Sequence, residues 1–144
     1  MAASSQWLFW ALLSAVFAAL TAIFAKAGLQ DINSDFATLV RTAMILLVLA
    51  AFVLGSGKWR PPASVSASTW GWLLASALAT GASWVCYFRA LQAGDASKVA
   101  AVDKGSLVLV ALFALAFLHE RLDSREWLGV GLVSAGIVLM AFKR

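Results

Sequence analysis

The sequence predicts an all-α integral membrane protein that forms a bundle of five transmembrane helices. Two observations predict this fold class. First, 62% of the 144 residues are hydrophobic and only 12% are charged, a composition that argues strongly against a soluble globular domain. Second, the apolar segments are each about 20 residues long, the length that a helix needs to cross a hydrocarbon core of about 30 Å. A membrane barrel would instead show shorter segments of alternating polarity.

Polar turns divide the apolar sequence into five predicted spans of a single domain that covers residues 1–144. The spans lie near residues 7–29, 36–55, 69–92, 97–118 and 126–142. Because their number is odd, the two chain ends are expected on opposite sides of the membrane. The side that holds the N-terminus is called side A, and the opposite side is called side B.

The first span, 7–29, carries small residues at four-residue spacing, which align on one face and let another helix approach closely. Lys26 lies near its side B end, where it can either reach the lipid headgroups or face a cavity. The polar turn 30–35 follows. Within it, Asn33 or Ser34 is expected to cap the next helix.

The second span, 36–55, carries Arg41 about two turns in from side B, too deep for a flanking residue. Its end is set by Pro61 and Pro62, which cannot continue a helix. The loop around them is the longest in the chain. Arg41 therefore needs a partner, water or a function within the bundle.

The third span, 69–92, brings aromatic rings close to a cation. Past its middle lie Trp84, Tyr87 and Phe88, followed directly by Arg89. Two interpretations stay open, because such rings can line a binding cavity or simply fill the bundle.

The fourth span, 97–118, holds two full charges about 9 Å from its start, at Asp103 and Lys104. A charge near the middle of a membrane helix costs roughly 2.5–3.5 kcal/mol per residue on insertion scales. These two residues are therefore the first candidates for function. The sequence places several cations around Asp103, which argues against a role as a proton carrier.

A tight polar turn leads into the fifth span, 126–142. Asp123 and Glu126 have the three-residue spacing of a capping box, with Asp in place of the usual Ser or Thr. His119 lies in the same turn beside charged residues, so an interfacial position is expected for it rather than a metal site.

Charged and aromatic residues gather at opposite ends of the predicted bundle. Within roughly 10 Å of side B lie Lys26, Arg41, Arg89, Lys98, Asp103 and Lys104. Side A receives Trp7, Trp10, Trp59, Trp70, Trp72 and Trp127, as an interfacial aromatic belt would. The excess positive charge suits an anionic or zwitterionic solute. Alternatively, Asp103 binds Arg41 or Arg89 in a buried network while the other cations reach water.

The balance of basic residues predicts an antiparallel homodimer. Side A loops hold Lys58, Arg60, Arg121 and Arg125, and side B holds Lys143 and Arg144 with Lys26 and Lys98 near its surface. The positive-inside rule then favours neither orientation. Two opposed copies would place one charge layer near each membrane face and a site between repeats.

Several classes of function are disfavoured. The basic residues mostly flank or enter the spans, where charge sets topology or contacts lipid headgroups, so no nucleic-acid partner is expected. Cys86 is the single cysteine and is interpreted as a small hydrophobic residue. No metal-ligand cluster, phosphate-binding glycine loop or activated nucleophile is present in the sequence, so neither a cofactor nor an enzymatic activity is predicted.

Four motifs carry a family resemblance. They are residues 89–97 (RALQAGDAS), 102–106 (VDKGS), 118–122 (LHERL) and 127–132 (WLGVGL). Together they resemble the EamA repeat of the drug/metabolite transporter superfamily. Residues 33–42 and the Asp103–Lys104 pair are similar to those of its short bacterial and archaeal members, which consist of one repeat. The resemblance implies a multi-pass protein of the bacterial inner membrane.

The resemblance also concerns the predicted dimer and the possible coupling of transport to protons. Larger relatives join two such repeats in inverted orientation, so the five-helix bundle corresponds to one inverted-repeat unit. His119 stands where the family usually has Gly, and Lys104 falls near a frequent Pro of longer relatives. The related small multidrug resistance proteins use a Glu in their first helix, whereas the first span here has no carboxylate. A proton-coupled exporter of cations is therefore disfavoured.

The sequence thus predicts a secondary transporter or exporter of a small polar metabolite, anionic or zwitterionic, that works by alternating access in an antiparallel homodimer within membrane lipids. The predicted substrate-binding or gating residues are Arg41, Arg89, Asp103, Lys104, Lys26, Trp84 and Tyr87. Two alternatives stay open: a transporter or flippase of a lipid-linked or amphipathic substrate, and a non-transporting membrane subunit of a larger complex.

Overall fold

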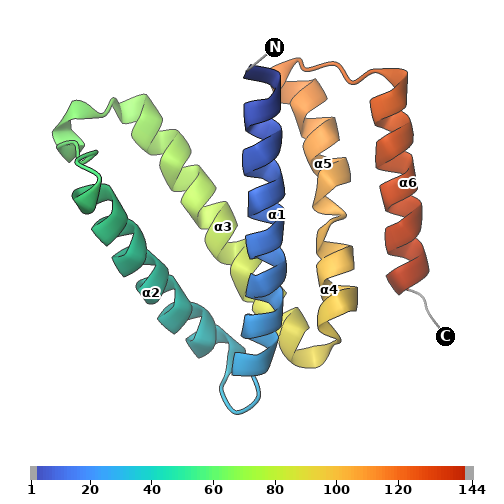
Figure 1. Cartoon of the computed structure of the whole chain (residues 1–144), viewed down its shortest axis with the longest axis horizontal. Helices are drawn as coiled ribbons and strands as arrows, with labels where there is room; N and C mark the ends of the chain where they lie inside the picture. The colour runs from blue at the N-terminus through green and yellow to red at the C-terminus, as the bar shows by residue number, and fades with distance from the viewer. Residues whose placement is uncertain (1–2, 142–144) are drawn as a thin grey trace. The chain divides into compact units, whose positions relative to one another are not determined.

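The structure is a computed structural model that describes residues 3–141 and is helical throughout, apart from turns and loops (Figure 1). Its elements are α1 (Ala3–Gly28), α2 (Ser34–Gly55), the 3₁₀ turn η1 (Pro62–Ser64), α3 (Ala67–Ala93), α4 (Ala96–Asp103), α5 (Ser106–Phe113), the π-helical turn η2 (Ala114–Leu118) and α6 (Ser124–Ala141). The predicted all-α class is confirmed.

Five helical segments of the described chain are long and apolar enough to cross a membrane, as predicted. They are Gln6–Gly28, Ser34–Gly55, Ala67–Ala93, Ala96–Leu118 and Ser124–Ala141. The basic pair Lys143 and Arg144, used above for topology, lies outside the described residues.

The chain divides into two compact units. The first unit contains the residues up to Ala22 and those from Gly94 onward, and the second unit is Ile23–Ala93. The assignment of a single domain over residues 1–144 stays a prediction. In the first unit, α6 packs against α4 and α5. In the second unit, α2 packs against α3.

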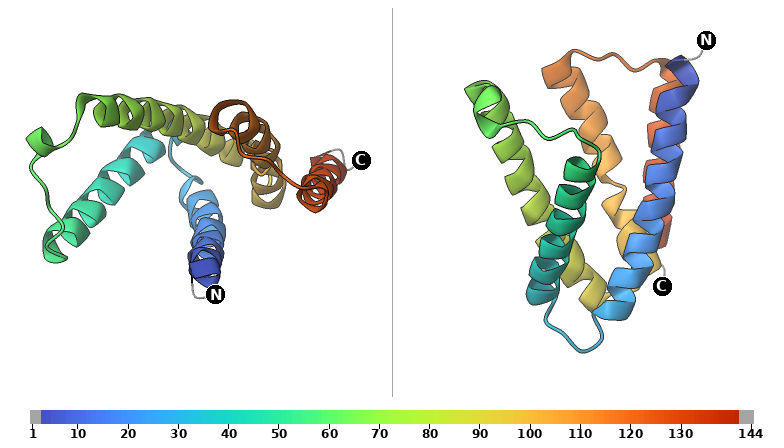
Figure 2. Two further views of the ribbon diagram at one scale, coloured as in Figure 1. Left: turned by 90° about the horizontal axis from the view of Figure 1, so that it is seen from above. Right: turned by 60° about the vertical axis from the view of Figure 1, so that its left-hand side comes forward.

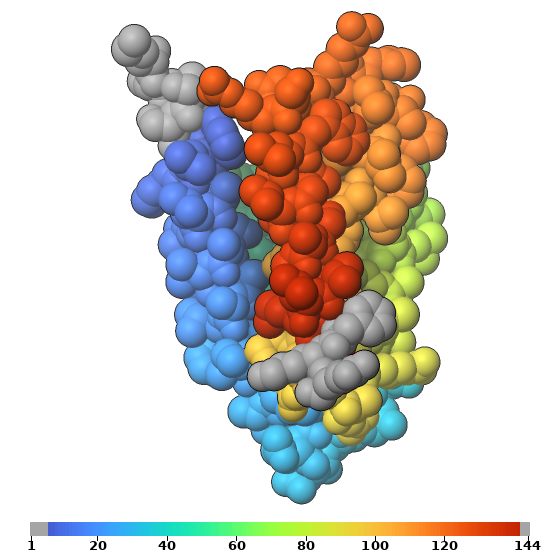
Figure 3. Space-filling view, turned by 90° about the vertical axis from the view of Figure 1, so that its right-hand side faces the viewer, coloured from blue at the N-terminus to red at the C-terminus, as the bar shows by residue number. Residues whose placement is uncertain are grey.

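Apolar side chains lie mainly on the outside of both units. Only 6–11% of each candidate span is buried within the chain. Helix α6, which forms an open surface of its unit (Figure 3), exposes Leu128, Leu132 and Leu139. Lipid tails solvate such residues as well as a protein core does, so they face outward without cost in a membrane.

Side-chain caps begin two of the helices as expected. The Oδ1 atom of Asn33 accepts hydrogen bonds from the backbone N–H groups of Asp35 and Phe36, at 2.9 and 3.2 Å. At the start of α6, Asp123 Oδ1 accepts from the N–H of Glu126 at 2.8 Å, and Glu126 Oε2 accepts from the N–H of Asp123 at 2.7 Å. These contacts confirm Asn33 as the cap of α2 and the reciprocal capping box at α6.

The fourth span is interrupted, where the sequence predicted one continuous helix. Helix α4 ends at Asp103, and α5 begins at Ser106. Between them, the N–H of Gly105 donates to Val102 O over 2.8 Å, the short-range pairing of a tight turn. A Cβ atom on Gly105 would lie 2.9 Å from that same carbonyl oxygen. The absence of a side chain at residue 105 therefore permits the turn.

The span ends at a residue with left-handed backbone conformation. His119 follows the π-helical turn with φ 55° and ψ 23°. Glycine adopts this conformation without a steric penalty, and it is the usual residue just after a helix. The left-handed conformation at residue 119 gives a physical reason for the glycine that related sequences usually have at this position.

Replacing His119 with glycine should stabilise the protein by about 0.5–1 kcal/mol, because the left-handed strain of a side chain exceeds the added entropy of the unfolded chain. The midpoint of unfolding in mixed detergent micelles measures the effect. His119→Ala removes the ring but keeps a Cβ atom, so it should not stabilise. Equal stabilisation by both substitutions would contradict the explanation from backbone strain.

Candidate functional site

One end of the second unit is held together by side chains that cross from one segment to another. This tied end comprises the last turn of α1, the turn that follows it, the start of α2 and the last turns of α3. Lys26 Nζ donates to Leu91 O at 2.6 Å, and Gln92 Nε2 donates to Ile32 O at 2.9 Å. Leu91 is fully buried beneath these contacts. Helices α2 and α3 converge toward this end and lie farther apart at the 56–66 loop (Figure 2).

The tied end contains a bidentate ion pair between α3 and α2. Arg89 Nε donates to Asp35 Oδ1 at 2.8 Å, and Arg89 Nη2 donates to Asp35 Oδ2 at 2.7 Å. Both side chains are exposed on the chain, by 63% and 47% respectively. The carboxylate that binds Arg89 is therefore Asp35, whereas one of the two alternatives from the sequence had Asp103 bind Arg41 or Arg89. Because Asp35 lies in the first turn of α2, the spans hold one more anion than predicted.

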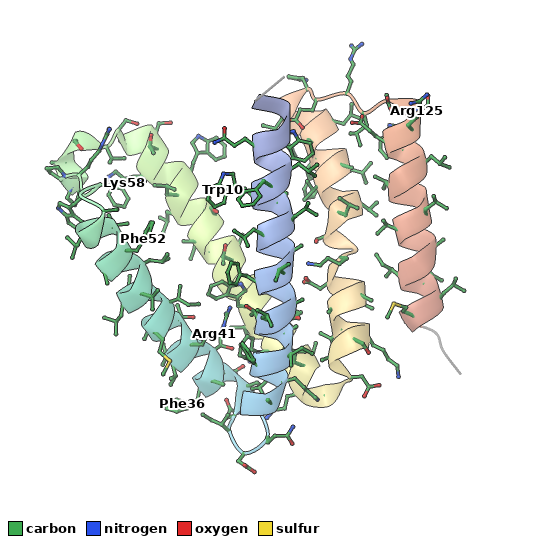
Figure 4. All side chains as sticks on the ribbon, in the orientation of Figure 1. Trp10, Phe36, Arg41, Phe52, Lys58 and Arg125 are labelled. Atoms are coloured by element: carbon green, nitrogen blue, oxygen red, sulfur yellow. The ribbon has the colours of Figure 1, made fainter. Side chains whose placement is uncertain are left out.

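Arg41 points from α2 toward α3, where its guanidinium group meets two aromatic rings (Figure 4). Its Cζ atom lies 4.6 Å from the centroid of the Trp84 ring and 5.4 Å from that of Phe88. Cation–π contacts of this kind contribute about 0.5–2 kcal/mol. Within residues 3–141, no carboxylate lies within ion-pair distance of Arg41.

The aromatic cluster is partly core and partly open. Phe88 is buried, whereas Trp84 and Tyr87 are half-buried. The rings of Tyr87 and Phe88 meet edge to face, with centroids 6.4 Å apart. The cluster therefore packs the helix pair and contacts the guanidinium group. The other interpretation offered by the sequence, that these rings line a binding site, stays a prediction.

Neighbouring hydroxyl groups on α2 are occupied by their own helix. Thr38 Oγ1 donates to Ser34 O at 2.8 Å, and Thr42 Oγ1 donates to Thr38 O at 2.7 Å. Such bonds satisfy the hydroxyl donors within the helix. Among the described polar groups of α2 near Arg41, the guanidinium group is therefore the one with donors left for a ligand.

The first unit holds the other two predicted site residues at the interruption of the fourth span. Asp103 is the last residue of α4, and Lys104 forms the following turn. Lys104 Nζ lies 3.8 Å from Asp103 Oδ2, and both side chains are exposed. At the start of α4, Lys98 Nζ binds Asp95 Oδ2 at 2.9 Å. The pair at residues 103 and 104 thus marks a break in the helix.

Five of the seven predicted site residues come together in the second unit, where Lys26, Arg41, Trp84, Tyr87 and Arg89 surround the contact of α2 with α3. Their role in substrate binding stays a prediction. Asp35 was missed because it was assigned to the polar turn. Its helical position could have been inferred from the Asn33 cap, since a capped helix starts directly after its cap. Among the described residues, no group of three or more His, Cys, Asp or Glu side chains could hold a metal ion.

Five apolar helices of membrane length, with cations inside the spans, define a small multi-pass membrane protein. The chain belongs to the EamA-like transporter family, which it matches over residues 5–142. The resemblance seen in the sequence is thereby confirmed. Membership implies a transporter of the bacterial inner membrane, and it accords with the expectation that the protein is not an enzyme.

Relatives named as a transporter or as flippase subunits support this assignment. The chain is 56% identical over 138 residues to a protein of Sinorhizobium sp named an uncharacterized transporter in the cobO 3' region, with 96% of this chain and 98% of the relative covered. It is 30% identical over 108 residues to a probable 4-amino-4-deoxy-L-arabinose-phosphoundecaprenol flippase subunit ArnE of Aeromonas salmonicida, covering 67% and 95% of the two chains. A protein of the same name from Pectobacterium atrosepticum is 34% identical over 87 residues, covering 57% and 74%. No solved structure matches the chain.

Proposed function

We propose that this transporter moves a small anionic or zwitterionic solute by alternating access in an antiparallel homodimer. The observation that carries the proposal is the environment of Arg41. A guanidinium group inside a membrane span normally pairs with a carboxylate, and here it faces two aromatic rings instead. A carboxylate or phosphate group of the solute would supply the missing counter-charge.

The geometry leaves the hydrogen-bonding capacity of Arg41 available. A guanidinium group has five N–H donors, and a cation–π contact uses the face of the group rather than these donors. The rings of Trp84 and Phe88 therefore hold the cation in place and lower the cost of burying it. An oxyanion that binds two of the donors would form a charge-assisted, bidentate pair.

A second copy of the chain would complete the pathway. A five-helix unit corresponds to one of the two inverted repeats that form a transport site in many secondary transporters. The largely apolar exterior of the chain offers faces against which another copy could pack. The Ser56→Cys and Gln30→Cys variants, in a Cys86→Ser background, test this arrangement. Cross-links between the two kinds of chain support the antiparallel dimer, and links only between like positions contradict it.

A second candidate is a substrate with a lipid-linked phosphate. It is favoured by the ArnE relatives, whose names specify a phosphoundecaprenol-linked sugar and a flippase subunit. The same cations would then hold the phosphate near headgroup level. Proteoliposomes that take up a radiolabelled dicarboxylate or amino acid would favour the first candidate. Movement of a lipid phosphate alone, or only after a second subunit is added, would favour the other.

Replacing Asp103 with asparagine should reduce solute flux at least tenfold while the dimer stays assembled. The substitution leaves Lys104 without its neighbouring carboxylate at the interruption of the fourth span, so a cation inside that span loses its counter-charge. Flux into proteoliposomes measures the effect. Glu120→Gln, an equal change in an exposed loop, is the control and should leave flux unchanged. Equal flux in both variants would contradict a functional role for Asp103.

A further inference from the structure

We propose that Asp35 is an internal competitor for the solute's anionic group, and that its carboxylate occupies the Arg89 guanidinium until a ligand oxyanion displaces it. The inference deepens the proposed function, because it rests on an anionic ligand. It assigns a role to Asp35 and makes Arg89 the second anion-binding group beside Arg41. It also restricts the ligand to a compound with a carboxylate, phosphate or similar oxyanion, of which two oxygens can bind Arg89 at the same time.

The argument begins with the shape of the ion pair. Asp35 uses both carboxylate oxygens, and Arg89 uses the parallel Nε and Nη2 donors, over 2.8 and 2.7 Å. This is the arrangement in which arginine binds carboxylate and phosphate ligands bidentately. The site on Arg89 is thus formed for an oxyanion and already contains one.

The pair can be displaced because it is exposed. The side chains of Arg89 and Asp35 are 63% and 47% exposed on the chain, and exposed ion pairs contribute little net stability. A ligand oxyanion therefore has to overcome only a small preference for Asp35. Two further side-chain contacts of the tied end, from Lys26 and from Gln92, go to backbone carbonyl groups, and a ligand anion does not compete for a bond to a carbonyl oxygen.

Asp35 can release Arg89 without unfolding its helix. The backbone N–H of Asp35 donates to the Asn33 cap at 2.9 Å. The start of α2 is also held by Gln92, whose amide donates to Ile32 O. The release therefore requires only a side-chain rotation, and the released carboxylate stays at the helix N-terminus, where negative charge is favourable.

Displacement would change how α2 and α3 are joined. The Asp35–Arg89 pair is the single ion pair between these helices within residues 3–141. Arg41 makes the other charged contact, about 9 Å farther along α2. A ligand bound to Arg89 thus removes one of the two charged contacts between α2 and α3 at the tied end, toward which the helices converge (Figure 2).

Anion binding to the full-length protein in detergent micelles tests the inference. Sodium acetate and inorganic phosphate are titrated against the wild type, with tetramethylammonium chloride as the cationic control. Asp35→Asn should bind the anions about fivefold more tightly than the wild type, because the internal competitor is lost. Asp35→Glu keeps the charge and should retain the wild-type affinity. Arg89→Gln should bind them more weakly than either.

Three results would overturn the inference: unchanged or weaker anion affinity in Asp35→Asn, equal tightening in Asp35→Glu, or no anion binding by any variant. If Asp35→Asn does not fold, Asp35→Ser, which also removes the carboxylate, takes its place in the titration and should bind the anions more tightly than the wild type. Repeating the titration with phosphatidylglycerol in the micelles distinguishes a lipid headgroup from a free anion. Flux in the same variants is measured separately, so tighter binding without transport would reject the proposed function and keep the role of Asp35.

Discussion

Replacing Arg41 with alanine is expected to reduce flux of an anionic solute by about 10- to 100-fold, while the protein still folds and assembles. The substitution removes the guanidinium group that meets Trp84 and Phe88. Hydrogen bonds to a charged group contribute about 1.5–3 kcal/mol each, so the loss of one already corresponds to that range of rates, and the loss of both bonds of a bidentate pair sets the upper end of the effect. Flux into proteoliposomes is the measurement.

The stability of the Arg41 variant distinguishes a functional residue from a structural one. A cation within a membrane span costs about 2.5–3.5 kcal/mol on insertion scales, and the contacts with two rings return about 0.5–2 kcal/mol of it. Arg41→Ala should therefore leave the free energy of unfolding unchanged or raise it, even as transport is lost. Marked destabilisation together with normal flux would show that Arg41 serves packing alone.

Arg41→Lys is the matched control for the shape of the charge. Lysine keeps the positive charge and can still meet the faces of the aromatic rings, but it lacks the planar fork that binds two oxygens. We expect flux between that of the wild type and that of Arg41→Ala. If Arg41→Lys transports as fast as the wild type, charge alone suffices and a bidentate contact is not required.

The spans were predictable because their signal is long and repeated. About 20 apolar residues in succession can satisfy their backbone polar groups in lipid only as a helix. The cap at Asn33 and the capping box at Asp123 were predictable for a different reason, since each depends on residues within four positions of one another. Both kinds of inference need no knowledge of how the helices pack.

The partners of the buried and charged side chains depend on packing, and the sequence did not determine them. Arg89 has two acidic residues at suitable depth, Asp35 and Asp103, and only the register of α2 against α3 selects Asp35. The same register places Trp84 and Phe88, rather than another group, over Arg41. One turn of sliding between the helices would change every one of these contacts, because side chains on a helix repeat each 3.6 residues.

Replacing Gly105 with alanine is expected to destabilise the protein by about 1–3 kcal/mol and to reduce transport. The new Cβ atom would lie 2.9 Å from Val102 O, a backbone atom that can move away only if the turn between α4 and α5 opens. Gly129→Ala is the control within α6, where a Cβ atom meets nothing within 4 Å. That substitution should stabilise the helix by about 0.5–1 kcal/mol.

Comparing Gly105→Ala with Gly129→Ala distinguishes the effect of helix propensity on stability from the effect of the tight turn between α4 and α5. If the interruption at Lys104 and Gly105 were an ordinary weak point of a continuous helix, alanine would strengthen both sites alike, since it favours helix over glycine. A loss of stability at Gly105 with a gain at Gly129 instead requires the close approach to Val102. That turn also sets the direction of the side chains of Asp103 and Lys104. We therefore expect Gly105→Ala to lower both the stability and the flux, and Gly129→Ala to leave the flux unchanged.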